Sequence, residues 1–198
     1  MKRITVAITG ASGAIYALRT LRALLMRRVA VDVVISEFGW MLLRDEAGFE
    51  GKQQNFGEFI RERYGVSVDN MALHPLKNLA ATLASGSAQS DGMVVVPCSM
   101  KTLASIAHGL SRNLIERAAD VTLKEHRKLI IVPRETPMNL IQLRNMVAVA
   151  EAGAVVVPAM PAFYQKPETF DDLADFVVGR ILSLLGIEHD LYPEWEGS

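Results

Sequence analysis

The chain carries short apolar runs, separated by longer stretches in which apolar residues recur at helical spacing. The runs are rich in Val and Ile and do not alternate cleanly with polar residues, which is typical of strands buried on both faces of a parallel sheet. Five such runs occur, at residues 4–9, 29–36, 93–97, 128–133 and 154–158. We therefore predict five parallel strands.

Helical patterns lie between these runs, at residues 14–27, 37–46, 56–64, 101–109, 113–126 and 139–151, and a last one at 170–185 follows the fifth run. Strands that alternate with helices predict a doubly wound α/β sheet in three layers. We expect one domain over residues 1–198, an irregular segment at 65–92, and a tail at about 186–198 that docks on a neighbouring subunit.

Composition and charge narrow the class of protein. The 198 residues are 50% apolar, with a net charge of -1, a sequence pI of about 6.4 and a mean hydropathy of +0.20, which argues against disorder and against nucleic-acid binding. A single cysteine, Cys98, excludes an internal disulfide and a CxxC zinc site. No apolar run approaches the ~18 residues of a membrane helix. We expect a cytoplasmic protein without a metal site.

Polar residues gather directly after the predicted strands. In open α/β sheets, ligands bind beyond the carboxyl ends of the strands. Those ends lead here into residues 10–13, Ser36, 98–102, 134–136 and 158–164, which supply glycines, hydroxyls, cations and a tyrosine. This clustering predicts a ligand site along one edge of the sheet.

The first of these segments, residues 10–13, lacks the glycine spacing of a dinucleotide fingerprint. Its glycines and the Ser12 hydroxyl still suit a phosphate or a flavin ring against bare backbone. The alternative is an ordinary tight turn in which Ser12 only caps the following helix.

The third segment is the better anion site. Ser99 and Thr102 flank the start of a predicted helix and Lys101 adds a positive charge, a set that suits a monophosphate. An ordinary serine cap with a solvated lysine explains the same residues. Cys98 is expected to be a small buried residue at the strand end.

Several charged residues have both a functional and a structural interpretation. Arg134 and Glu135 follow a buried strand and either hold a ligand phosphate or pair with each other. Arg117 and Lys124 share a helical stripe, where an ordinary charge ladder of Glu116, Asp120 and Lys124 is the simpler interpretation. For Glu46, Tyr164 and Arg180, the residues alone indicate only a surface carboxylate, core packing and a solvated cation.

Six motifs in order along the chain resemble the UbiX-type flavin prenyltransferases. They are Thr9-Gly10-Ala11-Ser12-Gly13-Ala14, Pro97-Cys98-Ser99-Met100-Lys101-Thr102-Leu103, Arg117-Ala118-Ala119-Asp120-Val121, Leu123-Lys124-Glu125, Pro133-Arg134-Glu135-Thr136-Pro137 and Pro161-Ala162-Phe163-Tyr164. The resemblance extends from Arg3 to Trp195. It implies a flavodoxin-like fold, a homododecamer and metal-free transfer of the dimethylallyl group of dimethylallyl phosphate to N5 and C6 of reduced FMN. The prenylated FMN then serves UbiD-type decarboxylases.

The resemblance also implies residue roles. FMN would be bound by Gly10, Ala11, Ser12, Ser36, Ser99, Met100, Lys101, Thr102 and Arg134, and dimethylallyl phosphate by Lys124, Tyr164 and Arg180, with Arg117 and Glu135 shaping its pocket. Glu46 would transfer a proton, with Ser12 and Glu135 as further catalytic candidates. Ser85, Gly86 and Ser87 match a Ser-Gly loop near a neighbouring subunit's site, and Trp195 matches a C-terminal tryptophan.

The chain departs from the family pattern at Glu37, where many relatives carry Lys, and at Gln142 and Arg144, where His and Glu are common. None of these positions is among the residues expected to bind the flavin or the phosphate. The departures concern local side-chain pairing and the subunit interface. Three other functions remain open: an FMN-binding accessory subunit, a flavin-dependent cysteine decarboxylase of the same fold, and direct decarboxylation of an aromatic acid. The first helix contains no His, which counts against the cysteine decarboxylase.

Overall fold

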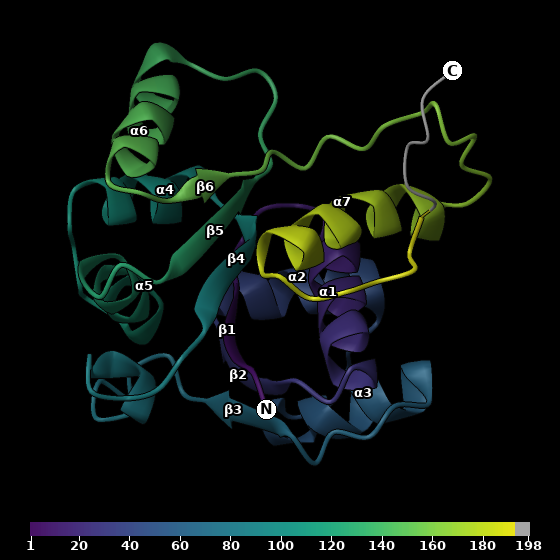
Figure 1. Ribbon diagram of the computed structural model, residues 1–198. Coiled ribbons are helices and arrows are strands. Elements are labelled where there is room, and N and C mark those ends of the chain that lie inside the picture. The colour runs from purple at the N-terminus through teal and green to yellow at the C-terminus, as the bar shows by residue number, and fades with distance from the viewer. Residues whose placement is uncertain (193–198) are drawn as a thin grey trace.

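A computed structural model describes residues 1–192 and contains a six-stranded, wholly parallel sheet with the strand order β3-β2-β1-β4-β5-β6 (Figure 1). The strands are β1 (Arg3–Ile8), β2 (Ala30–Ile35), β3 (Met71–His74), β4 (Gly92–Cys98), β5 (Lys128–Pro133) and β6 (Val155–Val156). The order reverses between β1 and β4, which makes the sheet doubly wound, as predicted.

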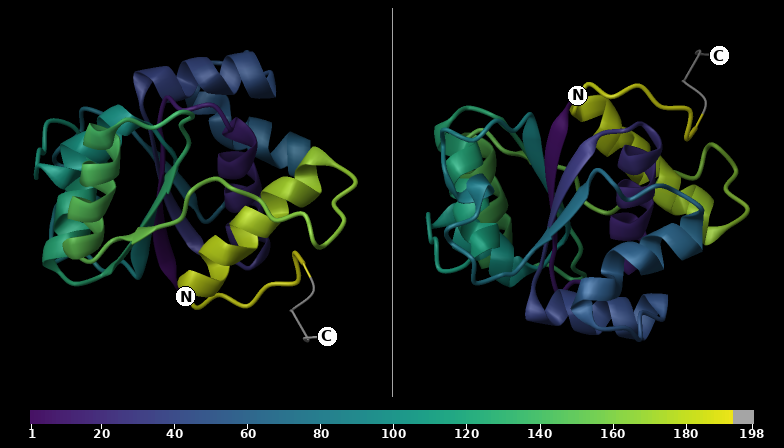
Figure 2. Two further views of the ribbon diagram at one scale, coloured as in Figure 1. Left: turned by 90° about the horizontal axis from the view of Figure 1, so that it is seen from above. Right: turned by 90° about the horizontal axis from the view of Figure 1, so that it is seen from below.

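Helices cover both faces of the sheet (Figure 2). One face carries α1 (Ala14–Met26), α2 (Glu37–Ala47), α3 (Phe56–Tyr64) and α7 (Phe170–Leu184). The other carries α4 (Met100–Ala107), α5 (Leu114–Lys124) and α6 (Leu140–Glu151). The three-layer, flavodoxin-like arrangement is confirmed.

Each central strand contributes to two separate cores. In β4, Val94 and Val96 pack with α1 and α7, whereas Met93 and Val95 pack with α4 and α5. Successive side chains of a strand point to opposite faces, so a strand with helices on both faces favours apolar residues along its whole length. This preference explains the runs of Val and Ile, which the buried Thr5 and Asp32 interrupt.

Two edge strands differ from the prediction. The segment 65–92, which we expected to be irregular, contains β3 and a short 3-10 helix at Thr82–Ala84. The four residues of β3 are half-buried or exposed and none is β-branched, so they lack the signal of a central strand. At the opposite edge, β6 has only 2 residues, although an apolar run covers 154–158.

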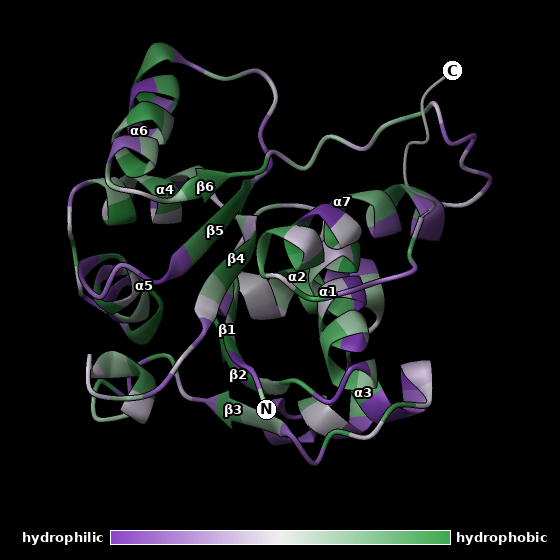
Figure 3. Ribbon diagram, viewed as in Figure 1, coloured by the Kyte–Doolittle hydropathy of each residue, from purple (hydrophilic) through white to green (hydrophobic). Residues whose placement is uncertain are grey.

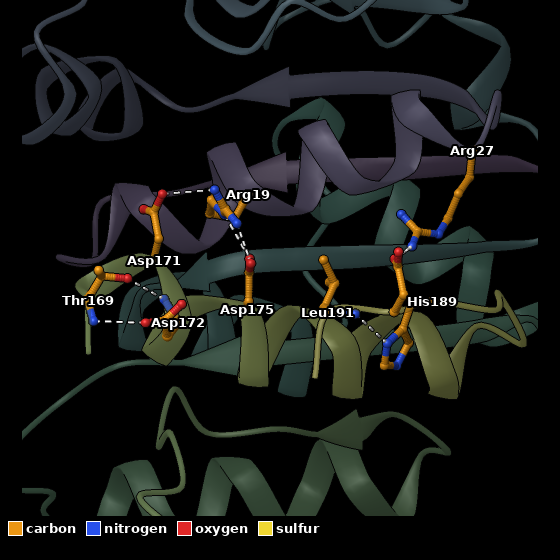
Figure 4. A network of polar contacts seen from close by, with 9 residues as sticks. Arg19, Arg27, Thr169, Asp171, Asp172, Asp175, His189 and Leu191 are labelled. Atoms are coloured by element: carbon orange, nitrogen blue, oxygen red, sulfur yellow. Dashed lines mark hydrogen bonds and ion pairs between the residues drawn. The ribbon is translucent and has the colours of Figure 1, made fainter. Parts of the chain in front are cut away.

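Ionic contacts join α7 to α1 (Figure 4). Arg19 of α1 pairs with both oxygens of Asp175 and, at 2.9 Å, with Asp171. Nearby, Arg27 donates to the Glu188 carbonyl at 2.7 Å and to Asp190 at 2.6 Å. The described part of the C-terminal tail therefore lies against its own chain. Its docking on a neighbouring subunit stays a prediction, and Trp195 lies outside the described residues.

No helix in the described part of the chain combines the length and the apolar character needed to cross a bilayer.

Candidate functional site

The carboxyl ends of β1 and β4 lie side by side where the strand order reverses, at the switch point of the sheet. Most of the predicted site residues meet here. We call the set Gly10, Ala11, Ser12, Ser36, Glu46, Ser99, Met100, Lys101, Thr102 and Arg134 the switch-point cluster. It joins the β1–α1 turn, both ends of α2, the start of α4 and the residue after β5.

The β1–α1 turn is packed closely against α2. A side chain at Gly10 would come within 2.3 Å of the Phe38 Cβ, so only glycine fits there. Gly13, the residue that caps α1, has a φ of 119° and no side chain with which to bind the first helical amides. The predicted alternative that Ser12 caps α1 is therefore wrong.

Glu46, at the end of α2, takes over this capping role. Its carboxylate accepts hydrogen bonds from the amides of Gly13 (2.9 Å) and Ala14 (2.8 Å) and from the Ser12 hydroxyl. Partial burial raises the pKa of Glu46, but these hydrogen bonds and the charge of Arg134 outweigh it and hold the pKa below its ordinary value. Glu46 is therefore a carboxylate at neutral pH.

The α4 N-terminus is the more open anion site. Ser99 caps the helix by accepting from the Thr102 amide at 3.3 Å, and its hydroxyl also contacts the Thr102 hydroxyl at 3.1 Å. The amides of Met100 and Lys101 precede the first intrahelical hydrogen bonds and so remain available to a ligand. Lys101 is exposed beside them. The capping role predicted as the alternative for Ser99 is present and leaves room for an anion.

Two further residues complete this edge. Ser36 caps α2 by accepting from the Gly39 amide at 3.0 Å, and its own amide donates to the end of β1 at 2.9 Å. Arg134 donates from Nε to the Ser12 carbonyl at 3.1 Å, whereas Glu135 accepts from the Thr136 amide at 3.0 Å. Arg134 thus ties β5 to the β1–α1 turn instead of pairing with Glu135, which corrects the structural alternative for these residues.

Cys98 lies fully buried at the end of β4, as predicted. Burial raises the pKa of its thiol far above the ordinary value, so it does not form a thiolate at neutral pH. It serves packing rather than nucleophilic chemistry.

A second group of candidates gathers at the end of α5. The Lys124 ammonium lies 2.8 Å from where a side chain on Gly86 would begin, and the Ser85 and Ser87 hydroxyls are 2.9 Å apart. Arg117 donates to the Ala84 carbonyl at 3.1 Å. These residues, Ser85, Gly86, Ser87, Arg117 and Lys124, form the α5 cluster.

The predicted charge ladder along α5 is wrong. Glu116 is buried and binds Arg112 at 3.1 Å, Asp120 pairs with Arg117 at 2.9 Å, and Lys124 contacts Glu125 at 2.8 Å. Glu116 lies on the buried side of the helix and is therefore unavailable to residues four positions on.

The remaining candidates belong to the α7 side of the sheet. Tyr164, in the segment after β6, packs edge-on against Phe176 of α7 with ring centroids 6.0 Å apart. Arg180 is one helical turn further along α7 and is exposed. Because α7 and α5 cover opposite faces of the sheet (Figures 1 and 2), one chain does not bring Lys124 together with Tyr164 and Arg180.

The α5 cluster is also distant from the switch point along the strands. Lys124 precedes the start of β5, whereas Arg134 follows its end. A strand of this length separates them by roughly 20 Å at ~3.3 Å per residue. A site that uses Lys124 together with the switch-point cluster therefore requires a second copy of the chain.

The geometry fits a flavin phosphate better at α4 than at α1, because the Glu46 carboxylate already occupies the α1 amides. Ser99, Thr102, Lys101 and the open α4 amides can hold the phosphate, while the glycine-containing turn offers flat backbone to a ring. Among residues 1–192, no three His, Cys, Asp or Glu side chains are arranged to hold a metal ion.

One residue that organises this edge was missed from the sequence. The Thr9 hydroxyl bridges the ends of β1 and β4, with contacts of 2.8 Å to the Pro97 carbonyl and 2.8 Å to the Ser99 amide. A hydroxyl at the end of an otherwise apolar run, directly before a Gly-rich turn, is the signal that could have identified it.

Comparisons with known proteins identify the family to which the chain belongs. The Flavoprotein family model matches residues 1–182. A protein named flavin prenyltransferase UbiX from Halalkalibacterium halodurans is 48% identical over 191 residues, which cover 96% of this chain and 92% of the relative.

Two solved structures are also similar. AnUbiX, in complex with FMN and dimethylallyl pyrophosphate, has a TM-score of 0.87 and 41% identity, with 100% of this chain and 98% of that chain covered. A dodecameric FMN-dependent UbiX-like decarboxylase from Escherichia coli O157:H7 has a TM-score of 0.86 and 40% identity over 98% of this chain and 100% of that one. The chain therefore belongs to the Flavoprotein family and, within it, to the flavin prenyltransferases.

Proposed function

We propose that this protein transfers the dimethylallyl group of dimethylallyl phosphate to N5 and C6 of reduced FMN. The observation that carries the proposal is the switch-point cluster, where an open helix N-terminus, bare backbone and an ionised Glu46 meet at one edge of the sheet. The similar AnUbiX binds FMN and dimethylallyl pyrophosphate, which supports the same ligand classes here.

Reduced FMN, when bound, supplies the two ring atoms to which the five-carbon unit is joined. The ring is faced by the backbone of Gly10, Ala11 and Ser12. The phosphate is held by the hydroxyls of Ser99 and Thr102, the amides of Met100 and Lys101, and the positive charge of Lys101. Ser36 and Arg134 close the site on either side. Arg134 also holds the β1–α1 turn in position through its bond to the Ser12 carbonyl.

Cations and a phenol stabilise the phosphate as it leaves the allyl group. Tyr164 and Arg180 approach it from one chain, and Lys124, with Arg117 behind it, from a neighbouring copy. Glu135 lies beside Arg134 and shapes this pocket. The Ser85, Gly86 and Ser87 loop, which contacts Lys124, accompanies that residue into the neighbouring site.

Glu46 and Ser12 form a proton relay. The Ser12 hydroxyl interacts with the Glu46 carboxylate, which is ionised at neutral pH and can therefore accept a proton. Ring closure requires one proton to leave C6 and one to reach the alkene of the five-carbon unit, so a carboxylate that accepts and returns a proton suffices.

The exposed apolar surface of α6 supports an assembly of several copies of the chain. On α6, Leu140, Ile141, Leu143 and Val147 are exposed, Ile141 by 69%, and Figure 3 shows apolar residues along much of this helix. Exposed apolar area of this extent is typical of a contact surface. We propose a homo-oligomer of the dodecameric type of the similar E. coli structure, whose product passes to a UbiD-type decarboxylase.

The proposal is tested by anaerobic incubation with reduced FMN and dimethylallyl phosphate, followed by mass analysis of the released flavin. We expect a flavin enlarged by one five-carbon unit. Tight binding of oxidised FMN with no adduct would indicate a non-catalytic accessory subunit instead.

A further inference from the structure

The Thr9 side chain connects the two strand ends that flank the switch point. Thr9 directly follows β1 and is 1% exposed. Its hydroxyl donates to the Pro97 carbonyl at 2.8 Å and accepts from the Ser99 amide at 2.8 Å. The hydroxyl therefore both donates and accepts a hydrogen bond, and both bonds run from the end of β1 to the end of β4.

These two bonds continue into the proposed phosphate site. Ser99, held by Thr9 through its amide, caps α4 by accepting from the Thr102 amide at 3.3 Å. On the other side, the Thr9 carbonyl accepts from the Ala11 amide at 3.0 Å within the β1–α1 turn. Thr9 thus lies between the two segments that would bind the FMN ring and its phosphate.

The backbone alone fixes this spacing only in part. The Thr9 amide also donates to the Pro97 carbonyl, at 3.2 Å, but beyond that point β1 turns into α1 and β4 turns into α4. Within the described residues, the Thr9 hydroxyl supplies the side-chain contact to the Ser99 amide. Without it, that part-buried amide loses its partner and the start of α4 is free to shift.

We propose that Thr9 is a positioning residue for flavin binding, whose buried hydroxyl sets the separation between the β1–α1 turn and the N-terminus of α4. The inference rests on the proposed function in so far as this edge binds FMN. Thr9 is too buried to touch a ligand and acts through Ser99. A rigid second layer of this kind keeps binding groups at the spacing that a rigid ligand needs.

The test compares three variants by their Kd for oxidised FMN, measured by quenching of flavin fluorescence. Thr9→Val keeps the shape and removes the hydroxyl, and we expect it to raise the Kd roughly tenfold. Thr9→Ser restores the hydroxyl and should return the Kd to within about twofold of wild type. Thr20→Val is the matched control, since within residues 1–192 the buried Thr20 hydroxyl bonds only to the Tyr16 carbonyl of its own helix, at 2.7 Å.

The outcomes separate positioning from general stability. If Thr9→Val binds FMN as tightly as wild type, or if Thr20→Val weakens binding as much, the inference is wrong. Should Thr9→Val fail to fold, Thr9→Cys replaces it, because a thiol is a weaker donor and should raise the Kd above that of Thr9→Ser. Equal Kd values for those two variants would also overturn it. If the wild-type protein itself does not bind FMN, the proposed function fails, which is a different result.

Discussion

At the scale of single residues, Glu46 performs two tasks with one carboxylate. It caps α1, where Gly13 offers no side chain, and it holds the Ser12 hydroxyl at the switch point. The same hydrogen bonds that stabilise the turn lower the pKa of Glu46 and keep it ionised. In the proposed reaction the same carboxylate therefore serves both capping and proton transfer, and a substitution can separate the two.

Glu46→Gln should keep the cap and lose the proton acceptor. The amide oxygen of Gln can still accept from Gly13 and Ala14, so we expect FMN to bind with an unchanged Kd while turnover falls about 100-fold or more. Because the pKa of Glu46 is lowered, wild-type turnover should not decline as the pH falls from 7 towards 5 through titration of this group. Wild-type turnover in the variant would remove Glu46 from the reaction.

A second carboxylate, Asp32, stabilises the sheet away from the switch point. It is 4% exposed in β2 and bonds to His74 of β3 at 2.7 Å and to Arg3 of β1 at 3.0 Å. Burial raises the pKa of Asp32, but the hydrogen bonds from His74 and Arg3 outweigh it and hold the pKa below its ordinary value. The carboxylate therefore favours the folded state at neutral pH.

Asp32→Asn should lower the free energy of unfolding by about 1–3 kcal/mol at pH 7. Because the pKa of Asp32 is lower in the folded state than in the unfolded state, the ionised carboxylate stabilises the fold fully at pH values above the unfolded pKa, about 3.9. This stabilisation disappears as the pH falls through the folded pKa. Urea unfolding at several pH values should show wild type and variant converging below about pH 4. Asp45→Asn, at an exposed position of α2, is the control. A difference in the free energy of unfolding between wild type and Asp32→Asn that does not narrow at low pH would contradict this account.

At the scale of elements, the central strands were predictable because both faces of each are buried, which leaves continuous runs such as the one that forms β4. The edge strand β3 was not, because Met71–His74 is covered on one side at most and carries no such run. The positions of the strand ends also predicted where the polar candidate residues gather. Contacts between segments far apart in the sequence, such as Glu46 with the α1 amides or Thr9 with Ser99, depend on how the elements pack together and had no local signal.

The junction of α1 and α7 carries its own prediction. Arg19 and Asp175 have side chains only 11% and 13% exposed, so loss of Arg19 leaves a largely buried carboxylate unpaired. Arg19→Ala should lower the free energy of unfolding by about 3 kcal/mol, measured by urea denaturation. Arg61→Ala, which breaks the exposed pair with Glu58 on α3, should change it by about 1 kcal/mol or less. Equal effects of the two substitutions would contradict the assigned role of this junction.

At the scale of the whole molecule, the chain divides its phosphate-binding candidates between two faces of the sheet. Tyr164 and Arg180 belong to the α7 side, and Lys124 to the α5 side. The sequence order of the motifs does not reveal this division, because it depends on how the helices alternate between the faces. The proposed site then needs two copies of the chain, in agreement with the exposed apolar surface of α6.

Mixed oligomers test the shared site. Lys124→Ala and Arg180→Ala should each abolish most prenyl transfer when expressed alone. Co-expressed, they should recover about a quarter of wild-type activity, because random assembly restores both residues at that fraction of interfaces. Assembly is confirmed by the mass of the oligomer in light scattering. Mixed oligomers as inactive as either parent would show that the two residues do not meet across an interface.

The most direct measurement is the stoichiometry of the reaction itself. Wild-type protein is incubated without oxygen with reduced FMN and deuterium-labelled dimethylallyl phosphate, and both the flavin mass and the released inorganic phosphate are recorded. Flavin prenyl transfer predicts a flavin that carries the labelled five-carbon unit and one phosphate released for each flavin modified. Unmodified flavin from protein that binds FMN tightly, or phosphate release without a labelled flavin, would contradict it.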